Sequence, residues 1–281
     1  MHKQLTIGLF GFGVVGEGLY RVLQQTPSLN ASIKKVCIKD ASKKRNAPAE
    51  LFTTDKDVLL NDPEINVIVE VINESEPAYQ IVTTALNGGK DVVSASKKMI
   101  AEHLTALLEL QEKTGRSLLY EAAACASIPV IRNLEEYYDN DLLHSIKAIV
   151  NGSTNFILTK MFDENLDFKQ ALILAQQLGF AESDPKLDVE GYDAVNKWTF
   201  LLTHAYGIIE APEKILFNGI QHIHGGDASV ARARNQQIRL VAQAQKLQNG
   251  KVAAFVLPQF IQQDDHLAFV KNEYNGVVIE S

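Results

Sequence analysis

The sequence predicts an α/β protein with a doubly wound parallel sheet, followed by a second domain of α+β type. Three observations predict this class. A glycine-rich turn at residues 11–16 lies between an apolar run and a helical stretch. Strand and helix patterns then alternate as far as residue 128, as they do in parallel α/β sheets. From residue 129 onward, longer amphipathic helices and a late set of strand patterns indicate the second domain.

The glycine turn joins a predicted strand at residues 5–10 to a predicted helix at residues 17–25. In such a turn Gly11 permits the tight bend, Gly13 lets the backbone approach a pyrophosphate, and Gly16 lets the helix pack closely on its strand. The helix N-terminus then directs free N–H groups at phosphates. The pattern predicts a Rossmann-type sheet that binds a nicotinamide or flavin dinucleotide. The alternative is a glycine turn that serves close packing only.

The other elements of the first domain are short and closely spaced. Residues 67–72 form a nearly continuous apolar run, which is typical of a strand buried on both faces. Residues 77–86 are predicted to form a helix that ends at Asn87-Gly88-Gly89. Further strands are expected at residues 33–38, 91–94 and 117–121, and a further helix at residues 104–113.

The second domain, residues 129–281, combines helices with a sheet. Its longest predicted helix, residues 192–206, has apolar residues at helical spacing. The late strand patterns favour an antiparallel or mixed sheet. Other helices are expected at residues 129–138, 156–162 and 168–178, and strands at residues 144–150, 238–242, 252–257 and 268–270.

The bulk properties narrow the class of protein. The chain has 281 residues, of which 46% are hydrophobic, and a net charge of -7 that argues against a general nucleic-acid-binding protein. Two cysteines, Cys37 and Cys125, cannot build a disulfide framework and favour a reducing compartment. No apolar stretch reaches the length of about 18 residues that a membrane span needs. We therefore expect a cytoplasmic enzyme without a membrane or nucleic-acid partner.

The residues after the second predicted strand bear on the choice of dinucleotide. NAD-selective sheets place an acidic residue there to bind the ribose hydroxyls, and Asp40 suits that task. Lys39 and the basic run at residues 43–45 instead suit a 2′-phosphate, although such a run also fits a solvated turn. NAD and NADP both remain open, with a slight preference for NADP.

A polar, acid-rich segment at residues 179–191 leads into the long helix. Asp193 and Lys197 are spaced i, i+4 and share a helix face with Leu201, which directs the pair inward. A partly buried lysine beside a carboxylate has a tunable proton affinity and can exchange a proton with an alcohol oxygen during hydride transfer. Spacing alone fits a solvated ion pair at least as well.

Three further residues are candidates for substrate contacts. Glu182 and Asp188, in the acid-rich segment, suit a substrate that carries an ammonium group. Lys97 follows the predicted strand at residues 91–94, and ligands bind at the carboxyl ends of strands in such sheets. Lys97 therefore either reaches substrate and nicotinamide or is an ordinary surface lysine.

Several long motifs, in the same order, resemble those of the homoserine dehydrogenase family over nearly the whole chain. The acid-rich segment matches the family's signature, and residues 148–159 are similar to its loop at the domain junction. Residues 89–94 with Lys97, residues 120–122 and residues 128–131 also match. The signature positions are Ala175, Gly179, Phe180, Asp184, Pro185, Asp188, Gly191, Asp193 and Lys197.

The resemblance implies an oxidoreductase that interconverts L-homoserine and L-aspartate 4-semialdehyde with NADP or NAD, in threonine and methionine biosynthesis. It implies that Lys197 is the proton donor and acceptor at the substrate oxygen, and that Asp193 positions and polarises it. Glu182 would bind the substrate amino group, with Asp188 nearby. Lys97 would assist proton transfer where substrate and cofactor meet.

The resemblance also implies cofactors and an assembly. The glycines at residues 11–16 would hold the pyrophosphate, beside the backbone of Val14 and Val15. A monovalent cation, commonly sodium, would lie next to the active site. The family is usually a homodimer, formed through sheets of the second domain. The implied cation ligands are the Glu121 carboxylate and the backbone carbonyls of Ala124, Ala126 and Ile128.

The chain departs from the family pattern near the cofactor. Cys125 and Ser127 stand where glycines are common, and a side chain at a positive φ would strain the cation site and the nicotinamide pocket. Asn73 and Glu74 stand where the family commonly has a Gly-Gly pair, and Glu74 is expected to repel a phosphate or ribose there. Ser96 replaces the usual asparagine.

Two domains are therefore expected: residues 1–128 for the dinucleotide, and residues 129–281 for substrate binding, catalysis and dimerisation. The family continues beyond residue 281 with a glycine-rich segment and a helix, and a short natural form looks the same as a truncated one. The main hypothesis is an active, partly divergent homoserine dehydrogenase. The alternatives are a diverged paralogue that acts as a dinucleotide-binding sensor or interaction protein, and an NAD(P)-dependent oxidoreductase for another amino-acid aldehyde.

Overall fold

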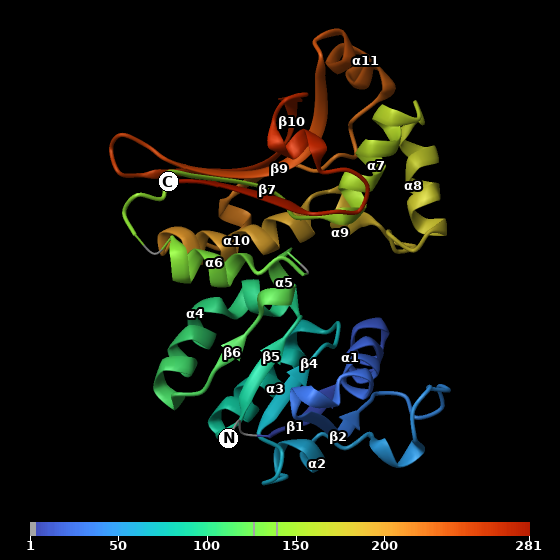
Figure 1. Cartoon of the computed structure of the whole chain (residues 1–281), viewed down its shortest axis with the longest axis vertical. Helices are drawn as coiled ribbons and strands as arrows, with labels where there is room; N and C mark the ends of the chain where they lie inside the picture. Colours follow the sequence, from blue (N-terminus) through green and yellow to red (C-terminus); the bar gives the residue numbers. More distant parts are fainter. Residues whose placement is uncertain (1–3, 126, 139) are drawn as a thin grey trace. The chain divides into compact units, whose positions relative to one another are not determined.

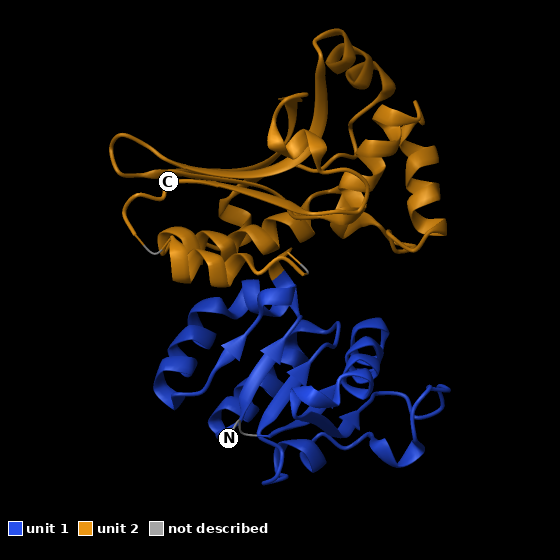
Figure 2. Cartoon of the chain, in the orientation of Figure 1, with its two compact units in different colours: residues 1–123 blue, residues 124–281 orange. Residues whose placement is uncertain are grey.

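A computed structural model describes residues 4–125, 127–138 and 140–281 of the chain. The chain divides into two compact units, Met1–Ala123 and Ala124–Ser281, which Figure 2 draws in different colours. Each unit has a sheet and a hydrophobic cluster of its own. Each therefore has the layered build of a folded domain.

The first unit is built on a six-stranded parallel sheet, shown in Figure 1. Its strand order is β3-β2-β1-β4-β5-β6, the doubly wound order of Rossmann-type sheets. The predicted fold class is confirmed for this unit. The strands are β1 Leu5–Phe10, β2 Ala31–Cys37, β3 Phe52–Thr53, β4 Val67–Glu70, β5 Asp91–Ser94 and β6 Leu118–Leu119.

Helices pack on this sheet and bury its central strands. All four residues of β4 are buried, in accord with their apolar run. Leu19 and Leu23 of α1 pack on a cluster that includes Ile7 and Leu9 of β1, and α3 contacts β4, β5 and α4. The helices are α1 Val14–Gln25, α2 Asp57–Leu60, α3 Ser75–Asn87, α4 Lys97–Thr114 and the short α5 Glu121–Cys125.

The second unit has a five-stranded mixed sheet of order β11-β7-β9-β10-β8. β8 runs parallel to β10, and the other neighbours are antiparallel, so the mixed sheet is confirmed. α10 contacts β9 and β10 and buries Trp198 and Phe200. The strands are β7 Ser145–Ile149, β8 Leu216–Phe217, β9 Gln236–Lys246, β10 Val252–Gln262 and β11 Gly276–Glu280. The helices are α6 Val130–Tyr137, α7 Gly152–Asp163, α8 Phe168–Gln177, α9 Lys186–Val189, α10 Tyr192–Tyr206 and α11 Gly225–Ala233.

The strand expected at residues 268–270 is wrong. His266–Phe269 forms a 3-10 helix, which begins where the Asp265 carboxylate accepts the Leu267 N–H at 2.8 Å. Leu267 and Ala268 are apolar because they pack on Ile149, Val241 and Ile261, not because they lie in a strand. The last strand is β11, which sequence analysis missed, together with β3, β8, α2, α5, α9 and α11.

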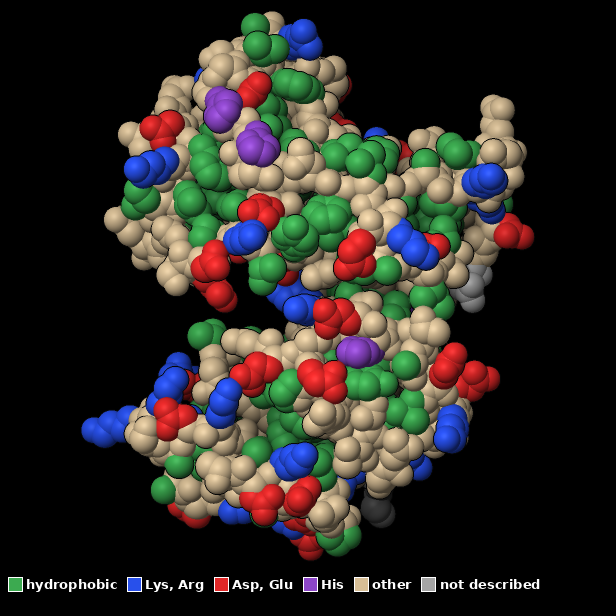
Figure 3. Space-filling model, turned by 180° about the vertical axis from the view of Figure 1, so that it is seen from behind, with side chains coloured by type: hydrophobic (Ala, Val, Ile, Leu, Met, Phe, Trp, Pro, Cys, Tyr) green, Lys and Arg blue, Asp and Glu red, His purple; other side chains and the backbone are tan. Residues whose placement is uncertain are grey.

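Four helices begin earlier than expected. α1 begins at Val14, α3 at Ser75, α4 at Lys97 and α7 at Gly152, each after the turn that follows its strand. Among the residues that the structure describes, no helix has both the length and the apolar character needed to cross a membrane. On the face shown in Figure 3, acidic and basic side chains are interspersed over both units.

Candidate active site

Two of the three glycines in the turn after β1 are required by packing. Gly11 has φ +97°, and a Cβ there would lie 2.9 Å from the Val71 carbonyl oxygen. A Cβ at Gly16 would clash with the carbonyl oxygen of Gly11, so α1 could not approach its strand. Both glycines would therefore be needed even in a protein that binds no ligand.

Gly13 differs, because packing does not explain it. Its backbone is extended, with φ -87° and ψ -156°, and an added Cβ would meet no atom within 4 Å. Val14 and Val15, the first residues of the 12-residue α1, leave 92% and 60% of their surface exposed. Open space in front of a helix N-terminus suits a pyrophosphate, and a side chain at residue 13 would fill that space. The residues present thus fit a dinucleotide.

The loop after β2 holds its charged residues in local contacts. Ser42 donates to the Asp40 carboxylate from both its backbone N–H, at 2.8 Å, and its hydroxyl, at 2.6 Å. These hydrogen bonds lower the pKa of Asp40, so the carboxylate stays ionised at neutral pH. Lys39 Nζ donates to Glu74 Oε1 at 2.6 Å, and this hydrogen bond raises the pKa of Lys39. The candidate phosphate ligand is therefore already paired.

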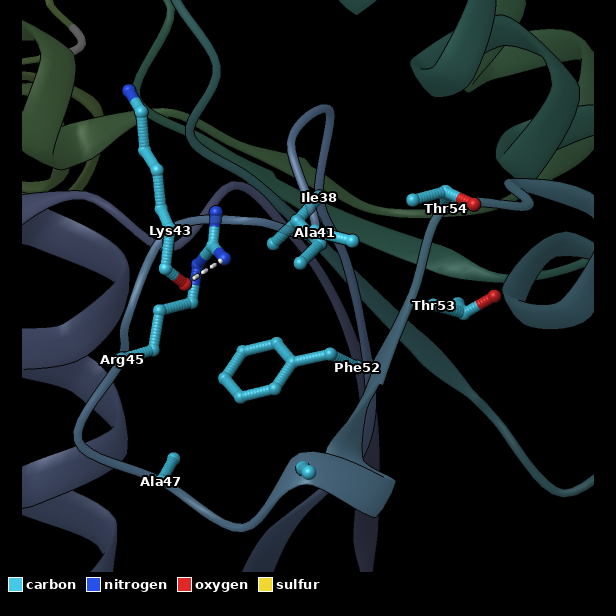
Figure 4. Close-up of a pocket in the computed structure, with 9 residues that line it drawn as sticks. Ile38, Ala41, Lys43, Arg45, Ala47, Phe52, Thr53 and Thr54 are labelled. Atoms are coloured by element: carbon cyan, nitrogen blue, oxygen red, sulfur yellow. Dashed lines mark hydrogen bonds between the residues drawn. The ribbon is translucent and has the colours of Figure 1, made fainter.

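A cavity of about 450 Å³ lies between the end of β2 and β3, and Figure 4 shows the residues around it. Ile38 and Phe52 supply apolar walls, and the Arg45 guanidinium lies 5.5 Å from the centre of the Phe52 ring. Arg45 also donates to the Lys43 carbonyl at 2.8 Å. Within the basic run at residues 43–45, which belongs to the loop after β2, Arg45 thus lies over an aromatic ring.

Glu70, at the end of β4, is a fully buried carboxylate that sequence analysis missed. Its Oε1 accepts the Ile72 N–H at 2.7 Å and the Ser96 hydroxyl at 2.8 Å, and its Oε2 accepts the Ser94 hydroxyl at 2.6 Å. Burial raises the pKa of Glu70, and these hydrogen bonds oppose that rise. The carboxylate joins the turn after β4 to the turn after β5. Lys97, half-buried, is the first residue of the helix that follows.

In the second unit, Lys197 and Asp193 form the ion pair that their spacing indicated. The Lys197 Nζ lies 2.7 Å from Asp193 Oδ2, and the two side chains are only 11% and 12% exposed. Lys197 Nζ also donates to the Val150 carbonyl at 2.7 Å, at the end of β7. The pair is therefore buried against the sheet and is not a solvated surface pair.

Asn151 connects this ion pair to a second carboxylate. Its Nδ2 donates to Asp193 Oδ2 at 2.8 Å and to Asp188 Oδ1 at 2.7 Å, while its Oδ1 accepts the Thr154 N–H and caps α7. Burial raises the pKa of Asp188, and the hydrogen bond from Asn151 opposes that rise. We call Asn151, Asp188, Asp193 and Lys197 the acid–lysine cluster. In the sequence, Asn151 stands out only as one residue of the family-like loop at residues 148–159.

Glu182 is not one of the residues of the acid–lysine cluster. Its side chain is exposed, and its backbone carbonyl accepts a hydrogen bond from Gln176 Nε2 at 2.9 Å. The structure therefore brings together Asp188, Asp193 and Lys197, three of the predicted site residues of this unit. Glu182 is close to them in sequence, but its side chain lies at the surface.

The proposed cation ligands lie around α5. Ala126 falls outside the described residues, while Glu121, Ala124 and Ile128 are described. Among the described residues, the non-glycine residues with positive φ are four asparagines, so Cys125 carries none of the expected strain. Asn73 and Glu74 carry none either. The substitutions at residues 73, 74 and 125 are thus compatible with this backbone, while the φ of Ser127 depends on residue 126, which lies outside the described residues.

Comparison with protein families identifies both parts of the chain. A model described as the NAD-binding domain of homoserine dehydrogenase matches residues 11–121, and one described as homoserine dehydrogenase matches residues 129–281. The chain belongs to the homoserine dehydrogenase family. The matched ranges contain the glycine turn and the acid–lysine cluster, respectively.

Known homoserine dehydrogenases resemble the chain over almost all of its length. The curated homoserine dehydrogenase of Bacillus subtilis is 35% identical, with 99% of this chain and 66% of that protein covered. The crystal structure of a homoserine dehydrogenase from Thiobacillus denitrificans superposes with a TM-score of 0.93 at 31% identity, covering 99% of this chain and 66% of that one. A hyperthermophilic archaeal homoserine dehydrogenase in complex with NADPH has a TM-score of 0.81 at 28% identity, with 99% and 88% covered.

This chain is shorter than the curated homoserine dehydrogenases that it matches. It spans about two thirds of their length, with 66% of the Bacillus subtilis protein and 65% of the Synechocystis protein covered. The shared part includes the NAD-binding domain and the homoserine dehydrogenase domain of the family.

Proposed function

We propose that this chain catalyses the NAD(P)-dependent interconversion of L-homoserine and L-aspartate 4-semialdehyde. The observation that carries the proposal is the acid–lysine cluster, in which Lys197 is buried and held by Asp193 and the Val150 carbonyl. Hydride can leave a carbinol carbon only if the hydroxyl proton also leaves, so the reaction needs a proton acceptor of this kind. Membership of the homoserine dehydrogenase family indicates that the alcohol is L-homoserine.

Lys197 is the proposed proton donor and acceptor at the substrate oxygen. An ammonium has three N–H donors, so the contacts with Asp193 and Val150 leave one for that oxygen. For homoserine oxidation the neutral amine of Lys197 accepts the hydroxyl proton, and in the reverse direction the ammonium returns it to the aldehyde oxygen. Asp193 stabilises the ammonium and fixes its position. A nicotinamide held by the first unit would supply the hydride acceptor or donor for this step.

Two carboxylates are proposed to bind the amino group of the substrate. Asp188 lies in the acid–lysine cluster, where Asn151 holds it at 2.7 Å. Glu182 is exposed and therefore free to reorient toward an ammonium group without a cost in packing. The amino group of homoserine would thereby be fixed while its hydroxyl faces Lys197.

The first unit is proposed to bind the dinucleotide, and the second to bind the substrate, carry out proton transfer and dimerise. The turn at residues 11–16 fits the pyrophosphate, with Val14 and Val15 at the open helix N-terminus. Lys39 is proposed to lie near the ribose of the dinucleotide, and Lys97 near its nicotinamide.

Family membership supports a cytoplasmic homodimer, and light scattering would test the dimer. It also supports a sodium site at Glu121, and exchange of sodium for tetramethylammonium would test that site.

The experiment that tests the proposed activity follows NAD⁺ and NADP⁺ reduction with L-homoserine, and NADH and NADPH oxidation with aspartate semialdehyde. D-Homoserine and L-serine are the control substrates, because they change the stereochemistry and the chain length. We expect turnover with L-homoserine and at least one of the two dinucleotides. Folded protein that binds dinucleotide yet turns over none of these substrates would contradict the proposal.

A further inference from the structure

The ion pair between Lys39 and Glu74 joins the two loops that flank the glycine turn. Lys39 follows β2, Glu74 follows β4, and both strands are neighbours of β1 in the sheet. The Lys39 Nζ lies 2.6 Å from Glu74 Oε1. The end of β2 is also tied directly to the turn, because Gly11 N donates to the Cys37 carbonyl at 3.0 Å. The pair therefore lies at the carboxyl edge of the sheet, where dinucleotides bind.

The loop after the second strand of such sheets meets the ribose that distinguishes the two dinucleotides. A carboxylate there favours the free 2′-hydroxyl, and a cation favours the 2′-phosphate. Lys39 is the first cation after β2, and Glu74 neutralises it. Asp40, next in the chain, remains an anion held by Ser42. The net charge of these three residues is therefore negative, which opposes a phosphate.

We propose that Glu74 is a specificity-determining residue that lowers the affinity of this chain for the 2′-phosphorylated dinucleotide relative to the dinucleotide with a free 2′-hydroxyl. It acts mainly by holding Lys39 in the ion pair, since that pair neutralises the ammonium and orients it toward Glu74 instead of toward a 2′-phosphate. This inference rests on the proposed dinucleotide site of the first unit and names which form of the dinucleotide that site disfavours.

The expected effect is modest, because both side chains are exposed, at 83% and 53%. Exposed ion pairs are screened by water and salt, so removal of Glu74 should raise the NADPH-to-NADH affinity ratio by about two- to fivefold. The effect should also shrink at high ionic strength. A backbone rearrangement is not needed, because Glu74 has a φ of -92° and its side chain caps no helix N–H.

The test measures dissociation constants for NADH and NADPH by fluorescence titration without amino-acid substrate, so that it does not depend on turnover. The variants are Glu74→Gln, Lys39→Met and the double variant. Glu76→Gln is the matched control, because Glu76 lies in the first turn of α3 and contacts Gln80 instead. We expect Glu74→Gln to raise the NADPH-to-NADH affinity ratio, Lys39→Met to lower it, and the effect of Glu74→Gln to be largely lost when Lys39 is absent.

Three results would overturn the inference. The affinity ratio could stay unchanged in Glu74→Gln, it could change equally in Glu76→Gln, or the effect of Glu74→Gln could persist in full without Lys39. Each of these leaves the proposed activity intact if the wild-type protein binds a dinucleotide. Failure of the folded wild-type protein to bind either dinucleotide would instead refute the proposed function, and with it the site on which this inference rests.

Discussion

Lys197 and Asp193 lie one helical turn apart on α10 and form an ion pair of 2.7 Å that is almost closed to solvent. A surface pair of this spacing would contribute little to stability and would need no further explanation. A buried pair is costly to desolvate, and it persists here because Val150 and Asn151 supply hydrogen bonds to its two partners. The proposed proton transfer depends on this arrangement.

The glycine turn allows ligand binding to be separated from packing. We expect Gly13→Ala to leave the free energy of unfolding unchanged or slightly raised, because a Cβ there meets no atom and the backbone is extended. It should weaken dinucleotide binding by about tenfold, equivalent to one lost charge-assisted contact. Gly16→Ala should instead lower the free energy of unfolding by about 1–3 kcal/mol through the clash with Gly11.

Urea unfolding and NADH titration of both glycine variants check this prediction. Equal loss of stability in the two variants would show that Gly13 is also required for packing. Unchanged NADH binding in Gly13→Ala would show that the open space in front of α1 is not used by the dinucleotide.

Asn151 should position the two carboxylates of the acid–lysine cluster. Asn151→Asp keeps an acceptor for the Thr154 N–H but replaces the donor to Asp188 with another acceptor. Because that hydrogen bond lowers the pKa of Asp188, its loss raises the pKa of Asp188 further. We expect the acid limb of the kcat/KM profile for homoserine to move to higher pH, since Asp188 must be ionised to bind the amino group.

The control for Asn151 is Asp167→Ala, which removes a helix N-cap on α8 of the same unit. It should cost about 1 kcal/mol of stability, as cap losses commonly do, without moving the pH profile. An acid limb that stays in place in Asn151→Asp, or that moves equally in Asp167→Ala, would contradict the positioning role.

The buried Glu70 should make stability depend on pH. Because the pKa of Glu70 is raised above its ordinary 4.5 by burial, the folded state binds its proton more tightly than the unfolded state. Its contribution is therefore fully present below pH 4.5 and is lost as the pH rises through the folded-state pKa. Each unit of elevation corresponds to about 1.4 kcal/mol. Glu70→Gln, which has no proton to lose, should lack this dependence.

Thermal unfolding of the wild type and of Glu70→Gln would test this pH dependence, measured from pH 4 to pH 8 in steps of about one pH unit. The difference between the two melting temperatures isolates the titration of Glu70, because all other groups are shared. A difference that is constant with pH, or that favours the wild type increasingly as the pH rises, would contradict it.

Glu182 should act on substrate binding alone. Its side chain is exposed, so Glu182→Gln should leave the fold unchanged while it raises the KM for homoserine by about ten- to a hundredfold, the value of one hydrogen bond to a charged group. Glu164→Gln is the control, because Glu164 is an exposed carboxylate of the same unit that pairs with Lys160. Steady-state kinetics would contradict the assignment if both variants retained the wild-type KM.

The strands of the first sheet other than β3, and the helix α10, could be predicted because local signals define them. The apolar run of β4 reflects burial on both faces, and Gly191 and Gly207, both in the left-handed region, bracket α10 at the expected residues. β11 pairs with β7, more than a hundred residues earlier, and no local pattern distinguishes such an edge strand from a loop. The apolar 3-10 helix at residues 266–269 was mistaken for that strand.

The residues of the candidate site also fall into two groups: those that local spacing indicates, and those that only the fold brings together. The pair of Asp193 and Lys197 follows from helical spacing, but its burial does not, since spacing alone fits a solvated ion pair at least as well. Asn151 reaches Asp188 and Asp193 across 37 and 42 residues of sequence, so only the fold reveals its part. The Lys39–Glu74 pair likewise spans 35 residues, and sequence analysis assigned the two side chains opposite effects on a phosphate without joining them.

The most direct test of the central claim is the single-turnover rate of hydride transfer from L-homoserine in Lys197→Met, compared with Lys186→Met. Lys186 is an exposed lysine of the neighbouring α9 and serves as the matched control. We predict that Lys197→Met lowers this rate by about 10²- to 10⁴-fold while dinucleotide affinity stays within about twofold of the wild type, and that Lys186→Met changes neither. Hydride transfer in folded Lys197→Met at the wild-type rate would contradict the account.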